Sequence, residues 1–540
     1  MNPKVSEPSS SDGEVYAVGD ELPPSTGEAL GSVEPHVFSN PRRASHWKQI
    51  YEDAAYEGRH RFDASFTWSA DEEKGLKKRL DWMVMAWVWV MVRHLLNYET
   101  CRVADPEPSS QALILFAETS IALCLTTCDY NTGNTIYLVT FLVAELPGGL
   151  ISKKVGPFRY TPTIIIIWGV LSALQPRQLL GIPSPHRSCA RRFHPEMVLY
   201  LSYFYKNNEL PFKLSIFYTV IPVTQIYGAL LAAGFLEMRG VLGWAGWQWL
   251  FLIEGLICVV IGLISFFVMP PSVTEPARAF RRPDGTNKWW TEREEKILVN
   301  RILRDDPTKG DMNNRTAVTL KGLWGALTNF DLWPIFIVGI FAWIPFQPTA
   351  NYLSLILREM GYSVFESNML TIPSYAIFAI NVVVLGWLSE HFKERSIIGS
   401  LSNVWMLPFF IALVSIPDSS SPWVRYVLIT GINSLPYAHS ILVGMTSRNA
   451  RSVGTRAVST AIYNMTYQIG SIIAANIYRD EDRPHYRTAN SALIGLCVAN
   501  ILLFISMKLY YIWRNRVLAR KYLESSEAEK QTAIDMRFAH

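Results

Sequence analysis

The chain has 540 residues, of which 49% are hydrophobic and 18% are charged. Its 50 basic residues nearly balance its 46 acidic ones, and a net charge of +4 excludes a nucleic-acid-binding protein. Six scattered cysteines form neither a pair nor a metal-binding spacing, which argues against a disulfide framework and a zinc module. The charges gather at both ends, in one central block and in short interruptions between apolar runs. This distribution argues against a soluble multidomain enzyme and predicts a chain that crosses a membrane several times.

Two segments precede the first apolar run. Residues 1–45 are rich in Ser, Pro, Glu and Gly and show no apolar period, which is typical of a disordered tail. Residues 46–81 combine aromatic and charged side chains, so we expect a helix or hairpin on the membrane surface.

Twelve candidate membrane spans follow, and most are long enough to cross a hydrocarbon core of about 30 Å. The first is interrupted by Arg93 and His94, and the second is short and carries Glu118. Residues 176–196, where another span is expected, are too polar to form a helix in a bilayer. The candidate spans are 82–97, 111–128, 134–152, 160–175, 212–236, 247–269, 332–357, 368–388, 396–416, 423–446, 455–477 and 489–512.

Basic residues in the short loops indicate the orientation of the chain. Lys and Arg follow the spans that end at residues 152, 388 and 512, whereas the loop 417–422 has none. This alternation places both termini and the central block in the cytoplasm.

The central block, residues 270–331, is predicted to be a linker with one helix. Thr291 and Glu294 form a capping box at its start, and Pro307 follows its end. The run RILRDDPTKGD at 301–311 resembles an acidic metal site, but we interpret it as a solvated charged turn at the membrane surface. No metal ion or cofactor is predicted, since no Walker A or dinucleotide fingerprint is present either.

One short sequence motif occurs in both halves of the chain. Gly149 begins GLISKKVGPFR after one span, and Gly386 begins GWLSEHFKER after another. Two six-span halves joined by a cytoplasmic linker are the arrangement of major facilitator transporters. We therefore predict an all-α integral membrane fold of two six-helix bundles, with damaged first and fourth spans. The predicted domains are a disordered cytoplasmic tail (1–45), a cytoplasmic membrane-surface segment (46–81), an N-terminal helical bundle (82–269), a cytoplasmic linker (270–331), a C-terminal helical bundle (332–513) and a cytoplasmic tail (514–540).

Five stretches carry a closer resemblance. They are CDYNTGNTIYLVTFLVAELPGGLISKKVGP (128–157), VLYLSYFYKNNELP (198–211), RGVLGWAGWQWLFLIEGL (239–256), REEKILVNRILRDDPTKGDMNNR (293–315) and STAIYNMTYQIGSIIAANIY (459–478). At these residues the chain resembles the allantoate permease-like branch of the fungal anion:cation symporter family, within the major facilitator superfamily. The resemblance covers most of 46–515. It implies proton-coupled uptake of a small organic anion (allantoate, a vitamin carboxylate or a sulfonate) across the plasma membrane. We expect a monomer in the lipid bilayer that binds this anion and a proton, and no nucleic acid.

Two regions depart from the family's pattern. An acidic-basic-Asn phrase in the first span is replaced by VRHLLNYETCRVADPEPSS, and the fourth span, with its arginine, is replaced by the polar residues 176–196. Good matches flank both regions, so our hypothesis is that a misread intron or frameshift replaced these spans. Two alternatives to an active carrier follow. The chain is a transporter-like sensor or receptor, or it is an inactive product of the misread gene.

Polar residues recur at helical spacing in four predicted spans, which predicts a polar cavity in the apolar bundle. Such side chains also bond neighbouring helices, so the type of any one residue does not assign its role. The predicted substrate-binding residues are Tyr218, Gln225, Gln347, Asn351, Asn433, Tyr437, Asn464 and Gln468. No Arg or Lys lies in the middle of a span in 204–512, so neutral donors and helix N-termini would hold the anion.

Ionisable groups inside spans are costly to bury and are therefore candidates for proton coupling. His439 is the first candidate, because histidine changes charge near neutral pH. Its helical position points away from the face of Asn433 and Tyr437, so a histidine bonded to a backbone carbonyl is the competing interpretation. Glu254 is the second candidate, with a structural bond to loop groups as its alternative. No paired carboxylates or His clusters gather at one depth, so we predict no catalytic residues and no enzyme.

Sequencing the transcript across residues 93–127 and 176–196 tests the hypothesis of a misread gene. We expect a different reading frame in both regions, encoding longer apolar spans. A transcript that encodes the present chain without change would refute it.

Overall fold

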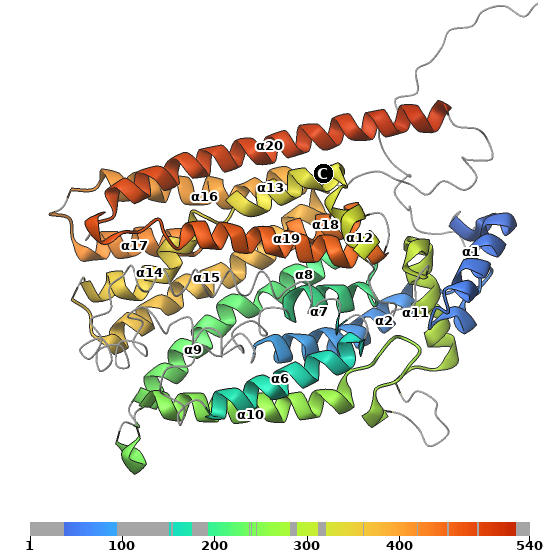
Figure 1. Cartoon of the computed structure of the whole chain (residues 1–540), viewed down its shortest axis with the longest axis horizontal. Coiled ribbons are helices and arrows are strands. Elements are labelled where there is room, and N and C mark those ends of the chain that lie inside the picture. Colours follow the sequence, from blue (N-terminus) through green and yellow to red (C-terminus); the bar gives the residue numbers. More distant parts are fainter. Residues whose placement is uncertain are drawn as a thin grey trace, which may run out of the picture. The chain divides into compact units, whose positions relative to one another are not determined.

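Every regular element that the structure describes is a helix (Figure 1). The structure is a computed structural model. It describes residues 37–93, 151–152, 155–174, 193–236, 238, 240–244, 246–280, 289–310, 320–359, 361–417, 419–450, 453–482 and 485–524. The candidate span 111–128 and nearly all of 134–152 lie outside these residues.

The folded chain begins earlier than the sequence predicts. Helix α1 spans Pro41–Asp53, and the Asn40 side chain caps its start by accepting a hydrogen bond from Arg42 N at 2.9 Å. Phe38 is buried and packs edge-on against Phe62, with ring centroids 5.1 Å apart. The prediction of a disordered tail is therefore wrong for residues 37–45, because aromatic contacts distant in sequence hold them. Residues 1–36 lie outside the described chain.

Helix α2 joins the predicted surface segment to the first span. It spans Ala70–Leu80 behind a capping box of Ser69 and Glu72, and it continues without a break through a π-helical turn, Asp81–Met85, to residue 93. Asp81 accepts hydrogen bonds from Lys213 Nζ at 2.7 Å and from Tyr205 Oη at 2.8 Å. The predicted boundary between residues 81 and 82 is thus not a structural boundary.

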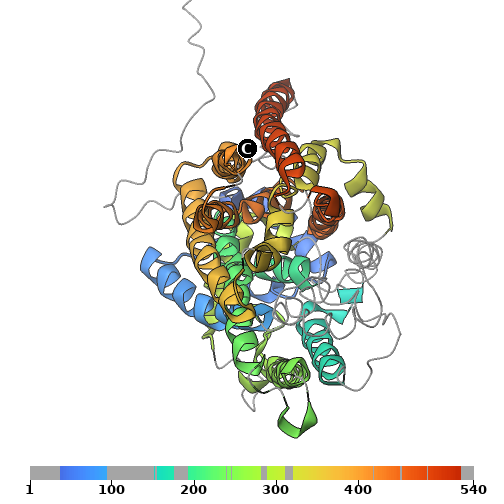
Figure 2. The same cartoon turned by 90° about the vertical axis from the view of Figure 1, so that its left-hand side faces the viewer.

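Within the described residues, the first half contributes five further helices. They are α6 (Pro157–Leu174), α7 (Phe193–Ser202), α8 (Leu210–Tyr218), α9 (Val220–Leu236) and α10 (Gly246–Val268). Helices α6 and α10 lie side by side (Figure 1, Figure 2). Glycines permit this approach, since a Cβ on Gly169 would lie 2.6 Å from the Gly255 carbonyl oxygen. Helix α7 begins at Phe193, within the last residues of 176–196, and it is not one of the stretches long and apolar enough to cross a membrane.

The second half contributes eight helices to the described chain. They are α13 (Trp333–Phe341), α14 (Phe346–Glu359), α15 (Val364–His391), α16 (Ser396–Ser415), α17 (Pro422–Asn433), α18 (His439–Asn449), α19 (Val453–Ala474) and α20 (Arg487–Glu524). Two predicted spans are broken, at Pro345 and near Pro436, as expected where proline removes a backbone donor. Helix α20 extends twelve residues beyond the predicted end of its span at 512, so the predicted tail begins inside a helix.

Seven helical stretches within the described chain are long and apolar enough to cross a membrane. They are Pro157–Leu174, Leu210–Leu231, Gln248–Val268, Phe330–Ala350, Phe365–His391, Ser396–Ser415 and Arg487–Arg520. Large apolar side chains are exposed on their outer faces, among them Leu256 on α10, Ile380 on α15 and Leu502 on α20. Such surfaces suit contact with lipid.

The linker between the halves contains the predicted helix and a second one. Helix α11 spans Glu292–Asp305, and both hydrogen bonds of the Thr291–Glu294 capping box are present, which confirms that prediction. Helix α12, Leu320–Leu327, was not expected. Arg301 and Lys309 are buried, with 1% and 7% of their surface exposed, so the interpretation of this run as a solvated turn is wrong.

The two halves meet closely along α8. This helix packs against α15 and α18, and Ser215 Oγ lies 3.0 Å from Ser440 Oγ across the contact. A Cβ on Gly386 would lie 2.1 Å from Ser215 Oγ, so only glycine fits at this point of α15.

Replacing Gly386 with alanine is expected to lower the melting temperature of the purified protein, because the methyl group must push α8 and α15 apart. Overpacking of this kind costs about 1–3 kcal/mol. Differential scanning fluorimetry in detergent measures the change.

Gly495→Ala is the matched control, since a Cβ there meets nothing within 4 Å and alanine favours a helix over glycine by about 1 kcal/mol. Equal melting temperatures for the two variants would contradict the close approach of α8 and α15.

Candidate functional site

Aromatic side chains from both halves of the chain gather where the halves meet. Tyr218, at the end of α8, comes from the first half, and the others come from the second half. Trp343 lies between α13 and α14, and His439 begins α18. The members of this central cluster are Tyr218, Trp343, Tyr437, His439, Tyr463 and Tyr467.

His439 lies at the middle of the central cluster and is 5% exposed. Its ring contacts Tyr218 edge-on with centroids 4.9 Å apart, and it stacks on Tyr437 at 5.3 Å. The Tyr463 hydroxyl lies 3.1 Å from His439 Nδ1, within hydrogen-bonding distance. A titratable group is therefore surrounded by aromatic rings from both halves.

The break near Pro436 produces this arrangement. Helix α17 ends at Asn433 and α18 begins at His439, so the residues between them are not helical. The predicted helical face of Asn433, Tyr437 and Ser440 is therefore not formed. For the same reason the expectation that His439 points away from Tyr437 is wrong, since the two rings stack.

One amide side chain, Gln347, bonds the central cluster, and a second, Asn433, contacts the same helix, α14. Gln347 Nε2 donates to Tyr467 Oη at 2.8 Å and to Ser471 Oγ at 3.4 Å. Asn433 is fully buried, and its Oδ1 accepts from Thr349 Oγ1 at 3.4 Å. Its Nδ2 has no hydrogen-bond partner within the described part of the chain. A buried donor without a partner costs about 1–3 kcal/mol, which leaves Asn433 available to an acceptor on a bound molecule.

The other predicted site residues are placed differently. Asn464 and Gln468 lie on α19, next in sequence to Tyr463 and Tyr467 of the central cluster. Gln225 is half-buried on α9, and the Asn351 side chain lies outside the described structure. Glu254 is buried on α10, one residue before the glycine that packs against α6. The structure thus brings together Tyr218, Tyr437 and His439, with Gln347 joined through Tyr467.

The sequence analysis missed three members of the central cluster. The predicted substrate-binding residues did not include Trp343, Tyr463 and Tyr467. A usable signal was present, because Tyr463 and Tyr467 are four residues apart and share a face of α19. In the structure Tyr463 also packs closely against Gly339, where a Cβ would lie 2.9 Å from Tyr463 Cε2. In the described residues, no group of three His, Cys, Asp or Glu side chains could hold a metal ion.

The helical architecture, with seven described stretches long and apolar enough to cross a membrane, is typical of an integral membrane protein. Residues 129–475, more than half of the chain, match the Major Facilitator Superfamily. The chain belongs to this superfamily and is a multi-pass transporter of a small-molecule substrate in a lipid bilayer, not an enzyme. The predicted fold class is confirmed.

Known proteins of similar sequence and structure agree with this assignment. The chain is 42% identical over 540 residues to the uncharacterized transporter YIL166C of Saccharomyces cerevisiae, covering 95% of this chain and 97% of that protein. Its fold is similar to that of the proton:xylose symporter XylE bound to 6-bromo-6-deoxy-D-glucose, with a TM-score of 0.52 and 14% identity over 78% of this chain and 95% of that one. It is also similar to the human organic anion transporter MFSD10, with a TM-score of 0.51 and 11% identity over 78% and 99% of the two chains. At these identities the two structures show the fold alone.

Proposed function

We propose that this transporter takes up a small organic anion together with a proton, across the plasma membrane, and that the central cluster is its binding and coupling site. The observation that supports this most is His439, a buried titratable side chain in contact with rings from both halves. The branch suggested by the sequence, the anion:cation symporters, is part of the same proposal.

The coupling of proton binding to the movement of the halves depends on which half supplies each neighbour of His439. Tyr218 belongs to the first half, and Tyr463 to the second. In alternating access the halves rock against each other around a fixed site. The contact between Tyr218 and His439 must then change, and water reaches the imidazole from one side or the other. Because burial and hydrogen bonding set how strongly a group holds a proton, each state of the carrier binds the proton with a different affinity.

Neutral donors can hold the anion. The central cluster contains no Arg or Lys, but the Gln347 amide bonds Tyr467 of the cluster, and Asn433, whose Nδ2 is unpartnered, contacts Thr349 two residues further along α14. A monoanion that binds with one proton adds no net charge to the apolar bundle. The cost of carrying a bare charge through the bilayer is thereby avoided. Glu254 is the second candidate for the proton, but it lies on α10, within the first half, so its neighbours need not change as the halves rock.

Replacing His439 with glutamine is expected to abolish the dependence of uptake on external pH. Cells that express the transporter are given a panel of labelled organic anions at external pH between about 5 and 7.5, the range in which histidine titrates. In the wild type, initial uptake should rise several-fold as the pH falls. In the variant it should be low and constant.

His391→Gln is the matched control, because His391 lies at the exposed end of α15 and stacks on Trp387, outside the central cluster. Tyr463→Phe adds a second comparison, since it keeps the ring and removes the hydroxyl beside His439 Nδ1 and should shift the pH at half-maximal uptake. Wild-type uptake that ignores the proton gradient would remove the proposal of symport.

Replacing Asn433 with aspartate is expected to raise the KM for the anion about tenfold or more. The change removes two N–H donors and adds a buried acceptor that repels an anion, and losing a hydrogen bond to a charged group costs about 1.5–3 kcal/mol. Initial rates at varied anion concentration give the KM. Asn476→Asp, at an exposed position just beyond α19, is the control and should leave the KM unchanged. Equal values for both variants would exclude Asn433 from the binding site.

A further inference from the structure

The segment before the first span, residues 37–68, packs along the linker helix α11, and we name it the brace segment (Figure 1). Tyr51 Oη donates to the Pro307 carbonyl oxygen at 3.1 Å, just beyond the end of α11. Asn300, on α11, bonds the backbone of the brace segment twice. Its Oδ1 accepts from Asp63 N at 2.9 Å, and its Nδ2 donates to the Arg61 carbonyl oxygen at 3.0 Å. Tyr51 and Asn300 are both fully buried.

Charged side chains strengthen the same contact. Arg61 forms an ion pair with Glu295 at 3.0 Å and a second one with Glu292. Arg304 donates to the Ala64 carbonyl oxygen at 3.2 Å, and its guanidinium lies 4.4 Å from the centre of the Trp68 ring. The brace segment thus holds α11 from its first turn to its last.

Helix α11 in turn is tied to the first half of the transporter. The Arg301 side chain is fully buried and forms ion pairs with Glu73 of α2, at 3.2 Å, and with Glu209, just before α8. A buried cation is stable only with such partners, because its desolvation costs several kcal/mol. Burial opposes ionisation of Glu209, but the charges of Arg301 and Lys77 outweigh it and lower the pKa of that carboxyl.

Asp306 follows α11 directly and connects the linker to both halves. Its Oδ2 accepts from Arg456 Nη2 of α19 at 2.7 Å and from Asn207 Nδ2 of the first half at 3.1 Å. Its Oδ1 accepts from Thr308 Oγ1 at 2.6 Å. Arg456 is buried, so this pair is shielded from water. Burial opposes the charge of Asp306, but Arg456 and Lys309 outweigh it and hold its pKa below the usual range.

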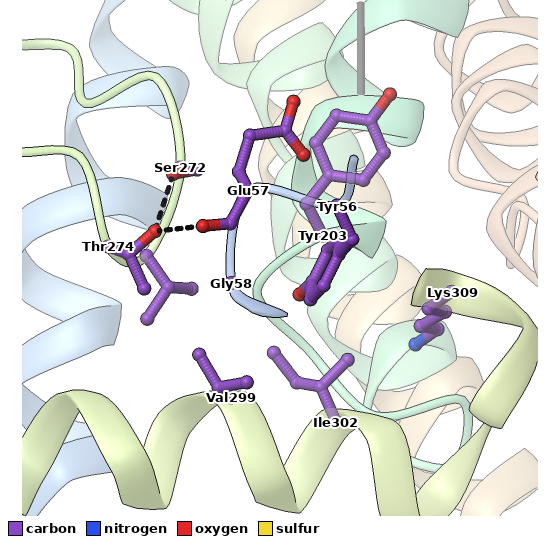
Figure 3. A pocket seen from close by; sticks show the side chains of 10 residues that line it. Tyr56, Glu57, Gly58, Tyr203, Ser272, Thr274, Val299, Ile302 and Lys309 are labelled. Carbon is purple, nitrogen blue, oxygen red and sulfur yellow. Dashed lines mark hydrogen bonds between the residues drawn. The ribbon is translucent and has the colours of Figure 1, made fainter. Parts of the chain in front are cut away.

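The brace segment is bound by these polar contacts and by buried aromatic side chains, among them Phe38 and Tyr51. Where it turns at residues 56–58, a small pocket separates it from the 272–274 loop and from Val299 on α11 (Figure 3). Thr274 Oγ1 crosses this gap and donates to the Glu57 carbonyl oxygen at 3.3 Å. Atoms that line a void lack packing partners on one side, so this part of the brace segment adds little to its attachment.

We propose that the brace segment is part of the transport machinery: it fixes α11 so that Asp306 reaches Arg456, and it thereby stabilises the state in which the halves are closed at the linker end. Because Arg301 ties α11 to the first half, the Asp306–Arg456 ion pair must break when the halves separate there, as must the hydrogen bond from Arg448 to Asn208. Loosening the brace segment therefore weakens the Asp306–Arg456 ion pair, although neither residue belongs to the brace segment. This proposal rests on the fold and not on the nature of the substrate or the coupling ion.

The carboxylates of the closure should stay charged throughout the physiological pH range. A carboxyl whose pKa is lowered in the folded protein adds stability above its ordinary pKa of about 4 and loses it only as the pH falls through the lower value. The lowered pKa values of Asp306, Glu73 and Glu209 keep all three groups ionised from pH 5 to pH 8. Burial lowers the pKa of Lys309, which donates to the Tyr205 carbonyl oxygen at 2.8 Å, to about 8, so it keeps most of its charge at pH 7.

Hydrogen exchange of the purified full-length protein in detergent, without substrate, tests the proposal. Asn300→Ala removes both backbone bonds to the brace segment but leaves Asp306 and Arg456 intact. Asp306→Asn weakens the closure directly. We expect both variants to speed amide exchange in residues 453–460 at the start of α19, by about tenfold for each 1.4 kcal/mol lost.

Glu52→Gln is the matched control, because Glu52 pairs with Arg59 inside the brace segment at 3.2 Å and should leave residues 453–460 unchanged. Arg304→Ala gives the same test if Asn300→Ala does not fold. Faster exchange confined to residues 37–68 in the brace variants, with residues 453–460 as in the wild type, would overturn the proposal. So would unchanged exchange at 453–460 in Asp306→Asn. Loss of symport with the expected exchange pattern would reject only the function proposed above.

Discussion

Inside a bilayer a polar group must find its partner within the protein, and this constraint organises the transporter. At the centre, where the halves meet, the partners are uncharged hydroxyl groups, as between Ser215 and Ser440. At the linker end, ions replace them, as between Asp306 and Arg456. Neutral bonds at the centre can be exchanged as the halves move, whereas each buried ion must keep a partner of opposite charge. The apolar outer faces of the helices carry none of these bonds and face the lipid.

Much of the fold could be predicted because its signals are local. Thr291 and Glu294 mark the start of α11, and the prolines mark breaks in two spans. The central cluster could be predicted only in part. The polar stripe identified Tyr437, but the prediction assumed a continuous helix, so it placed His439 on the wrong side of the chain. A break in a helix changes which side chains face one another, and helical periodicity does not predict the new arrangement.

The linker shows a different limit. Charged residues in a short run usually face water, and this rule failed for Arg301 and Asp306 because their partners lie far away in sequence. Three separate segments of the chain supply these partners, which are Glu73, Glu209 and Arg456. No local sequence pattern predicts that they lie close together. The buried run is also the place where the segment before the first span, the linker and both halves are connected. The burial of this run could therefore be recognised only from the three-dimensional structure.

Helix α20 has a practical consequence for imaging. Its 38 residues extend for about 57 Å at 1.5 Å per residue, roughly twice the thickness of the hydrocarbon core. Arg514 of α20 pairs with Asp331, just before α13, at 2.7 Å, which anchors the rod to the second half beyond its apolar portion. A rigid fiducial protein fused in helical register at Glu524 would inherit the orientation of that half. Single-particle cryo-microscopy could then align a small transporter that a detergent micelle otherwise hides.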